Sequence, residues 1–588
     1  MNFQKLLFFL ICLIFYSNLN ASYIVKFPHK ITQPDGKSYT CYITGDEYYS
    51  WLHDNDNYTI VQDEITGYFC YATLSNNKLI ASKCVVGKDS PILYGIKPNL
   101  KIPEEDIAKL YSDLKVNREF EEQNVYTKSA QAVRNMNNIV IYISFADQPE
   151  FGAKQDTISS YFNASASGAN SMYNYFREVS YQNLNVTSTF YPLNNGTQII
   201  SYKDNHIRNY YCPYSAQNDS GYSLTDTGVM MKARERTLVT NAINSVKSQI
   251  PSNLELDSDS NGKVDNICFI IRGAPVTPVP SFAKILWPHA YEYSPPYIYI
   301  NNKTVYSYNF QIEGYLDFKK TGVLCHEMFH SLGAGDLYHE TNNGITPVGT
   351  WDLMATETNP PQSMCADYKY RYGRWISEIP PISVSGHYSL NPITSPINNC
   401  YKISSSNTEE YFVLEFRQKT GTFESSIPGT GLIIYRIIKS ACCQNLYGPP
   451  DWIYIYRPDG TRENNGTIAN ANFDSSLGRS AFHNATNPSC FLSNGSLGNV
   501  YIKNITVSGN TVSFDVRFCD GDIVTHSNTS QLPSFSNAIT RIETSGTVLV
   551  KNTDNITFEA GQEIILNPGF EIQLGGQLTT NMNSCGNQ

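Results

Sequence analysis

The chain has 588 residues, of which 41% are hydrophobic and 16% are charged. This balance excludes a disordered chain, and the length is too great for one ordinary domain. The formal net charge of −10 leaves no basic footprint for DNA or RNA, so we expect no nucleic-acid partner.

The N-terminus has the layout of a secretory signal peptide. Met1–Lys5 carries one basic side chain, Leu6–Tyr16 is an apolar run, and Asn20–Ser22 offers a cleavage site. The alternative is a membrane anchor, but the apolar run is short for a span, and no later stretch is long enough. We therefore predict a signal peptide over residues 1–21, a secreted, extracellular protein and no transmembrane anchor.

Glycans and disulfide bonds are expected in that compartment. The predicted glycosylation sites are the Asn-x-Ser/Thr acceptors at Asn57, Asn163, Asn185, Asn195, Asn218, Asn302, Asn465, Asn484, Asn494, Asn504, Asn528 and Asn555. Of 14 cysteines, Cys12 leaves with the signal peptide, so at least one of the others is free or pairs between chains. An oxidising compartment favours disulfide bonds among the rest, with Cys519 and Cys585 as one candidate pair.

Residues 22–135 are expected to form a small unit ahead of the main domain. Short β-like runs such as 39–44 and 67–72 alternate with turns, and a charged, helix-prone stretch follows from Pro103 to Glu122. We interpret that stretch as a linker helix and the unit as a pro-segment, which would make the chain a zymogen. The alternative is a small β domain that stays attached.

The main domain is predicted over residues 136–377 and mixes strands with helices. A nearly continuous apolar run over 139–145 indicates a buried strand, and further strands and helices follow it. The predicted elements are strands over 139–145, 184–191 and 266–271, and helices over 171–179 and 231–249.

An acidic loop in this domain has the spacing of a calcium site. Oxygen-bearing side chains recur at alternate positions, namely Asp257, Asp259, Asn261 and Asp265. Gly262 permits the sharp turn, but Cys268 stands where a bidentate glutamate is usual. The loop is therefore a candidate Ca²⁺ site, and the alternative is a polar Asx-rich turn before a strand.

The most specific motif is HExxHxxGxxD, which starts at His326. His326 and His330 lie four apart on a predicted helix, so both imidazoles can reach one metal ion. Glu327 stands where it can act on a water held by that ion. Gly333 can end the helix and bring Asp336 in as a third ligand, which leaves one position open, as in catalytic zinc sites. His339 is a rival third ligand.

A second signal follows in the segment 349–355. It contains Met354 at about the distance where metzincins carry a tight turn with a methionine beneath the metal. The alternative for the whole motif is an amphipathic helix with two polar residues on its solvent-exposed face. The apolar residues around His326 and Met354 in its expected place favour the metal site.

Two all-β units are predicted after the main domain. Strands over 411–417, 431–436, 500–507 and 511–517 suggest an antiparallel sandwich in residues 378–518. Residues 519–588 contain shorter runs at near-regular intervals, punctuated by glycines: 547–550, 556–558, 563–566 and 570–574. This spacing predicts a small β-stack or solenoid.

These residues resemble the immune inhibitor A family of secreted zinc metallopeptidases. Cys325–Tyr338 followed by Val348–Ala355 carries the resemblance. Looser similarities extend it over roughly residues 28–518. The resemblance implies an α+β metzincin-like catalytic domain, preceded by a small pro-segment and followed by an all-β sandwich and a small C-terminal β-stack. One departure is Phe329, where many members have glycine, and it bears on substrate preference.

The expected function is that of a zinc endopeptidase acting as a monomer on proteins or peptides. Zn²⁺ would be held by His326, His330 and Asp336, and Glu327 would accept a proton from the attacking water. Candidate partners of the oxyanion are His289, Tyr338 and Tyr368. An unpaired cysteine among Cys41, Cys70 and Cys84 could keep the enzyme latent, but disulfide bonding of these residues is an equal alternative. The competing function is a catalytically inactive secreted adhesion or glycan-binding protein with the same fold.

Overall fold

A computed structural model gives the structure of the chain. It describes residues 19–582 except 22–23, 46–48, 64, 104–105, 107–132, 195, 215–217, 224–228, 275–285, 294–295, 340–343, 440–444, 446–447, 519–520 and 522. The linker helix predicted over Pro103–Glu122 falls almost entirely outside the described residues. Cys519 and Cys585 also lie outside them.

The N-terminal sheet, residues 24–85, is an antiparallel meander. Its six strands pair in chain order: β2 (Ile24–Thr32), β3 (Ser38–Gly45), β4 (Ser50–His53), β5 (Thr59–Gln62), β6 (Phe69–Ser75) and β7 (Lys78–Val85). Phe27 of β2 packs edge to face on Tyr315 and Phe318, with ring centroids 5.7 and 5.4 Å apart. The sheet therefore shares one apolar core with the domain that follows it.

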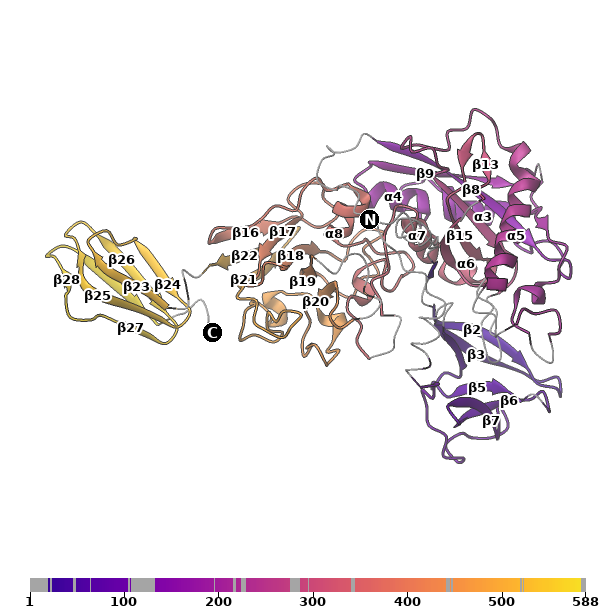
Figure 1. Cartoon of the computed structure of the whole chain (residues 1–588), viewed down its shortest axis with the longest axis horizontal. Coiled ribbons are helices and arrows are strands. Elements are labelled where there is room, and N and C mark those ends of the chain that lie inside the picture. Colours follow the sequence, from indigo (N-terminus) through magenta and orange to yellow (C-terminus); the bar gives the residue numbers. More distant parts are fainter. Residues whose placement is uncertain are drawn as a thin grey trace, which may run out of the picture.

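The central domain, residues 134–377, is built on a mixed sheet (Figure 1). Its strands are β8 (Arg134–Ser144), β9 (Leu184–Tyr191), β10 (Tyr202–Lys203), β11 (Asn266–Ile271), β12 (His289–Glu292) and β15 (Ser307–Ile312), with a separate small ribbon of β13 (Tyr299–Ile300) and β14 (Lys303–Thr304). β9, β8, β11 and β15 run parallel, whereas β12 is antiparallel to β15. The strands predicted over 184–191 and 266–271 are confirmed as β9 and β11.

Helices cover this sheet and carry the HExxH motif. They are α3 (Gln155–Asn163), α4 (Met172–Val179), α5 (Val229–Val246), α6 (Glu313–Lys319), α7 (Thr321–His330) and α8 (Ala366–Tyr368), with short 3₁₀ helices over Arg208–Tyr211, Lys247–Gln249 and Gly349–Trp351 and a π-helical turn over Lys369–Gly373. The helix predicted over 171–179 is α4, whose N-cap Ser171 accepts a hydrogen bond from Asn174 N. All ten residues of α7 are buried, which fits its place in the middle of the domain.

The strand β1 (Leu19–Ala21) continues the central sheet at its open edge. It pairs antiparallel with β12, with Ala21 opposite His289, and it lies beside α7. β1 falls within the predicted signal peptide. Removal of that peptide would therefore leave the outer edge of β12 unpaired.

Residues 378–518 form a sandwich of two antiparallel sheets. One contains β16 (Gly386–Leu390), β22 (Thr511–Arg517) and β21 (Tyr501–Ser508), and the other contains β17 (Cys400–Ser404), β18 (Glu410–Arg417), β19 (Gly431–Ile438) and β20 (Ile453–Ile455), with 3₁₀ turns over Ile468–Asn470 and Ser475–Leu477. Phe412, Leu414 and Phe514 belong to the core between the sheets. Val413 and Tyr435, on the opposite face, belong to the core of the central domain. β18 and β19 are therefore buried on both faces.

The C-terminal solenoid, residues 523–581, stacks parallel strands into two sheets at one end of the molecule (Figure 1). Its strands are β23 (Ile523–Thr529), β24 (Phe535–Ala538), β25 (Arg541–Val550), β26 (Asn555–Ala560), β27 (Glu563–Ile565), β28 (Phe570–Ile572) and β29 (Gln577–Asn581). Arg541 pairs with Glu563 and Asn555 with Gln577, so one coil of the solenoid spans 22 residues. A small separate core fills the space between the sheets.

The nine cysteines that the structure describes are all free thiols, so the disulfide bonds expected from the compartment are not formed among them. All nine are buried. Burial raises the pKa of Cys84 to about 11, with smaller contributions from Asp89 and Cys70. These thiols therefore stay protonated and act as small apolar side chains.

Lys369 provides a pH-dependent contact between the central domain and the sandwich. Its Nζ donates to Val179 O at 2.8 Å and to Ile393 O at 3.4 Å, and burial lowers its pKa from 10.5 to about 7. The unfolded chain therefore holds more protons than the folded chain between about pH 7 and pH 10, so stability rises with pH in that window. Urea unfolding of the wild type and Lys369→Met measures this effect. As the pH rises through that window, the free energy of unfolding of the wild type should increase relative to that of the variant by up to about 1.4 kcal/mol per pH unit. A pH-independent difference would contradict this assignment.

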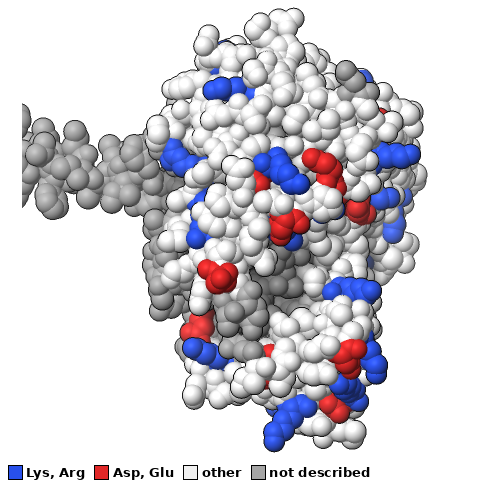
Figure 2. Space-filling model, turned by 90° about the vertical axis from the view of Figure 1, so that its right-hand side faces the viewer, with Lys and Arg blue, Asp and Glu red and all other residues white. Residues whose placement is uncertain are grey.

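On the face that Figure 2 shows, lysine, arginine, aspartate and glutamate side chains are scattered over a surface that is largely uncharged. The described residues form no single-sign patch on that face. Among the described residues, no helix is both long and apolar enough to span a membrane.

Candidate metal centre

The candidate metal ligands come from α7 and the turn that follows it. α7 ends at His330, and Gly333 adopts a φ of +94°, a left-handed conformation that favours glycine. Its N–H donates to His330 O at 2.8 Å, and the chain then reverses to bring Asp336 back to the helix. The turn therefore ends the helix and brings Asp336 beside the two histidines, which is the arrangement that the Gly-x-x-Asp spacing predicts.

The three predicted ligands converge. The Nε2 atoms of His326 and His330 lie 3.1 and 3.5 Å from Asp336 Oδ1. Ligand atoms of the three residues all lie within 4.8 Å of one another, and among the described residues they are the one group of three or more His, Cys, Asp or Glu side chains with this property. Together the three side chains could bind a divalent cation, because imidazole nitrogen and carboxylate oxygen are ordinary zinc ligands.

Backbone carbonyls orient both imidazoles. His326 Nδ1 lies 3.0 Å from Leu353 O, and His330 Nδ1 lies 2.8 Å from Ala334 O. These contacts favour the tautomer with a proton on Nδ1, which leaves Nε2 for the metal. The sequence could not predict these two carbonyls, because every residue has a backbone carbonyl and the residue type does not show which one accepts a hydrogen bond.

The electrostatics of the site suit a cation. Burial alone would lower the pKa of His326, but its hydrogen bond to Asp336 and the charges of Asp336 and Glu327 raise it to about 9. A proton on His326 therefore balances the carboxylates. A bound divalent ion would neutralise the carboxylates instead, and His326 would then lose its proton.

The segment 349–355 contacts the site. Leu353 supplies the carbonyl that receives His326, and Met354 is fully buried. Asp352, to which sequence reasoning gave no role, fixes this turn: its carboxylate accepts hydrogen bonds from Met354 N and Cys365 N, both at 2.7 Å. Tyr368 also supports the site, because its hydroxyl donates to Gly335 O at 2.8 Å, next to Asp336.

The rival ligand His339 and the oxyanion candidate His289 are both engaged in other contacts. His339 Nε2 contacts Asp451 Oδ1 and is not part of the metal-binding group. His289 lies on β12, with Nε2 3.2 Å from Glu235 Oε1 and Nδ1 2.8 Å from Trp287 O. These two contacts use both ring nitrogens, so His289 is a poor partner for an oxyanion in this arrangement.

Phe329 packs into the core rather than the floor of a cleft. It is fully buried, and its ring stacks on Trp375 with centroids 6.0 Å apart and contacts Tyr368 at 6.1 Å. The phenyl ring that stands in place of glycine is therefore accommodated by packing against neighbouring aromatic rings.

The predicted calcium loop has the contacts of its alternative, an Asx-rich turn. Asp257 accepts hydrogen bonds from Asn261 N and Gly262 N and pairs with Lys303 at 2.7 Å. Asp259 and Asp265 both pair with Arg134, at 3.2 and 2.7 Å. Lysine and arginine therefore pair with three of the four side chains predicted to bind Ca²⁺, and the calcium site stays a prediction.

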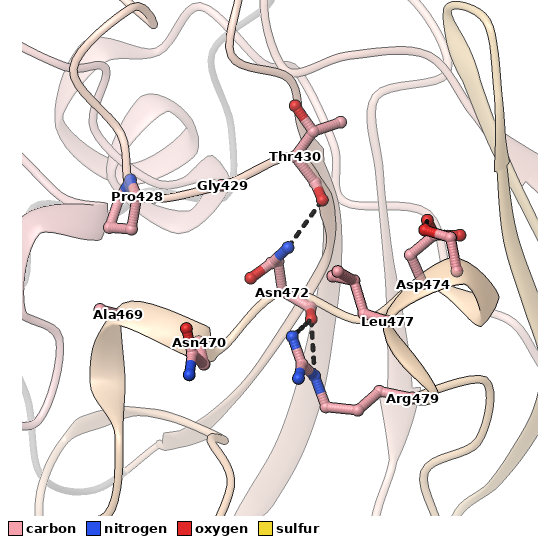
Figure 3. A pocket seen from close by; sticks show the side chains of 10 residues that line it. Pro428, Gly429, Thr430, Ala469, Asn470, Asn472, Asp474, Leu477 and Arg479 are labelled. Carbon is pink, nitrogen blue, oxygen red and sulfur yellow. Dashed lines mark hydrogen bonds between the residues drawn. The ribbon is translucent and has the colours of Figure 1, made fainter.

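A surface cavity of about 370 Å³ lies on the sandwich, away from these residues (Figure 3). It is lined by Pro428, Gly429, Thr430, Ala469, Asn470, Asn472, Asp474, Ser476, Leu477 and Arg479. Asn472 Nδ2 donates to Thr430 O, and Arg479 donates twice to Asn472 O. The cavity contains none of the predicted site residues.

No model of a known protein family matches this sequence, and no curated protein matches it significantly. The resemblance to the immune inhibitor A family therefore depends on the residues of the motif and its flanks.

Proposed function

We propose that the chain is a secreted zinc-dependent endopeptidase of the immune inhibitor A type, with a metzincin-like catalytic domain. The observation that supports this most is the convergence of His326, His330 and Asp336 around one point, with Glu327 beside the first ligand on the same buried helix. A fold that only needed a stable helix would gain nothing from burying two imidazoles and two carboxylates together.

Zinc, when bound, would polarise a peptide carbonyl and lower the pKa of water. Glu327 would accept a proton from the attacking water and pass it to the leaving amine. Its charge already reaches the neighbourhood of the site, since Glu327 contributes to raising the pKa of both His326 and His289. His326 and His330 keep their orientation through Leu353 O and Ala334 O while the proton moves.

The open edge of the central sheet offers a place for a polypeptide substrate. β12 already accepts β1 as an antiparallel neighbour beside α7. An extended peptide can add to a sheet edge through the same main-chain hydrogen bonds. A protein or peptide substrate would therefore lie along β12 once residues 19–21 have left.

The mature N-terminus is a direct test of this order of events. The four site residues are at most 4% exposed in the full chain, so the site must open before a substrate can enter. We expect N-terminal sequencing of the secreted protein to begin beyond residue 21, and casein hydrolysis to rise when residues 22–135 are also removed. Full activity in a chain that retains residues 1–135 would contradict this prediction.

A further inference from the structure

The strand β18 presents charged side chains to the central domain on the face opposite the core of the sandwich. Glu415 and Arg417 lie on it, and Glu424 follows in the next turn; all three are at most 1% exposed. Arg417 Nε and Nη2 donate to the two carboxylate oxygens of Glu424, both at 2.8 Å. Burying such a pair is costly unless its remaining hydrogen-bonding groups are also used.

Those remaining groups bind backbone of the central domain. Arg417 Nη1 donates to Trp351 O at 2.5 Å, and Nη2 donates to Ser363 O at 3.2 Å. Glu424 accepts from Ser363 N at 2.9 Å, and Glu415 accepts from Ala366 N at 2.7 Å. The sandwich therefore holds both ends of the segment 351–366.

This segment contains the carbonyl that orients the first metal ligand. Trp351 O, held by Arg417, is followed by Asp352, which ties Met354 N to Cys365 N, and by Leu353, whose carbonyl receives His326 Nδ1. A shift of Trp351 would therefore move Leu353 O, two residues on.

The sandwich also holds the backbone of the third ligand. Asn445 lies between β19 and β20, and its N–H donates to Asp336 O at 3.0 Å. Its Nδ2 donates to Leu337 O at 3.2 Å and to Ile453 O at 2.7 Å. The sandwich is thus connected to the site in two separate places. Arg417 acts on the segment that orients His326, and Asn445 binds the backbone of Asp336.

We infer that Arg417 is a positioning residue of the metal centre, acting through Trp351 and Leu353 on His326, and that the sandwich is an integral part of the catalytic unit. This inference rests on the proposed zinc site. Arg417 touches neither metal nor substrate, so its effect would appear in metal affinity as well as in catalysis.

Zinc binding by Arg417→Gln tests the inference, with Arg436→Gln as the matched control. Arg436 is also a buried arginine of the sandwich and pairs with Glu410 at 3.3 Å, but its ion pair and its ring contacts with Tyr454 and Phe491 all lie within the sandwich. Both substitutions break a buried ion pair, so both lower stability. Only the first one disturbs Trp351.

The full-length protein would be stripped with a chelator, and its affinity for Zn²⁺ measured by competition at a temperature where circular dichroism shows every variant folded. We expect Arg417→Gln to weaken zinc binding about tenfold, at the lower end of the effect of outer-shell residues, and Arg436→Gln to leave it near the wild-type value. Equal affinities in both folded variants would overturn the inference while the zinc site stands. A wild type that binds no zinc would instead overturn the proposed function.

Arg417→Lys is the second variant, in case the glutamine variant does not fold. Lysine keeps the charge opposite Glu424 but cannot reach Glu424, Trp351 and Ser363 together with a planar fork of donors. Weaker zinc binding in Arg417→Lys than in Arg436→Lys would support the inference. Equal binding in these two would overturn it.

Discussion

Glu327→Ala should abolish most casein hydrolysis without removing zinc. The side chain is the only proposed proton acceptor, and general acid–base catalysis contributes about 10²- to 10⁴-fold, so kcat should fall by that factor. The proposed metal ligands His326, His330 and Asp336 are unchanged in this variant, so elemental analysis should still find zinc bound.

The control for this variant is Glu409→Ala, which removes an exposed carboxylate of the sandwich. Its activity should equal that of the wild type. Undiminished proteolysis by Glu327→Ala would remove Glu327 from the mechanism, and loss of zinc together with activity would assign it a structural role.

Asp336→Ala should lose zinc, whereas His339→Ala should keep it. Asp336 Oδ1 lies 3.1 Å from His326 Nε2, while the His339 ring is engaged with Asp451. Removal of a direct ligand should weaken zinc binding by more than the roughly 10- to 100-fold that outer-shell changes cause. Elemental analysis and chelator competition on the two folded variants measure the difference.

The His339→Ala variant is also a control for stability, since it breaks a buried contact with Asp451. Its melting temperature should fall while its zinc content stays at the wild-type value. The reverse pattern, with zinc retained in Asp336→Ala and lost in His339→Ala, would assign the third ligand to His339.

The ligands were predictable because their geometry is local. His326 and His330 share one helical face, and Gly333 with Asp336 follows within one turn, so spacing alone brings them together. The strand β11 was predictable for a similar reason, because its apolar run is nearly continuous. The metzincin-like fold and the peptidase activity remain predictions that follow from these local patterns.

The support of the site was not predictable because it is long-range. Arg417 lies 66 positions after Trp351 in the sequence, and Asn445 lies far from Asp336; neither contact belongs to a spacing pattern. The state of the cysteines depended equally on the fold. Cys70 and Cys84 lie on adjacent strands, yet each remains a buried thiol.

The acidic loop makes contacts that its spacing does not predict. Its alternating oxygens fit Ca²⁺ by spacing, but Lys303 and Arg134 arrive from distant parts of the chain and pair with those carboxylates. Spacing within a loop cannot reveal a counter-charge that the fold supplies from outside it.

Titration of zinc back into the stripped, mature protein, with casein hydrolysis and bound zinc measured on the same samples, is the most direct test of the proposed zinc peptidase activity. We expect negligible hydrolysis without zinc and a linear rise that ends at one zinc per chain, with no such rise in Glu327→Ala. Full hydrolysis by protein that contains no zinc, or zinc binding at this site with no hydrolysis of any protein substrate, would contradict it.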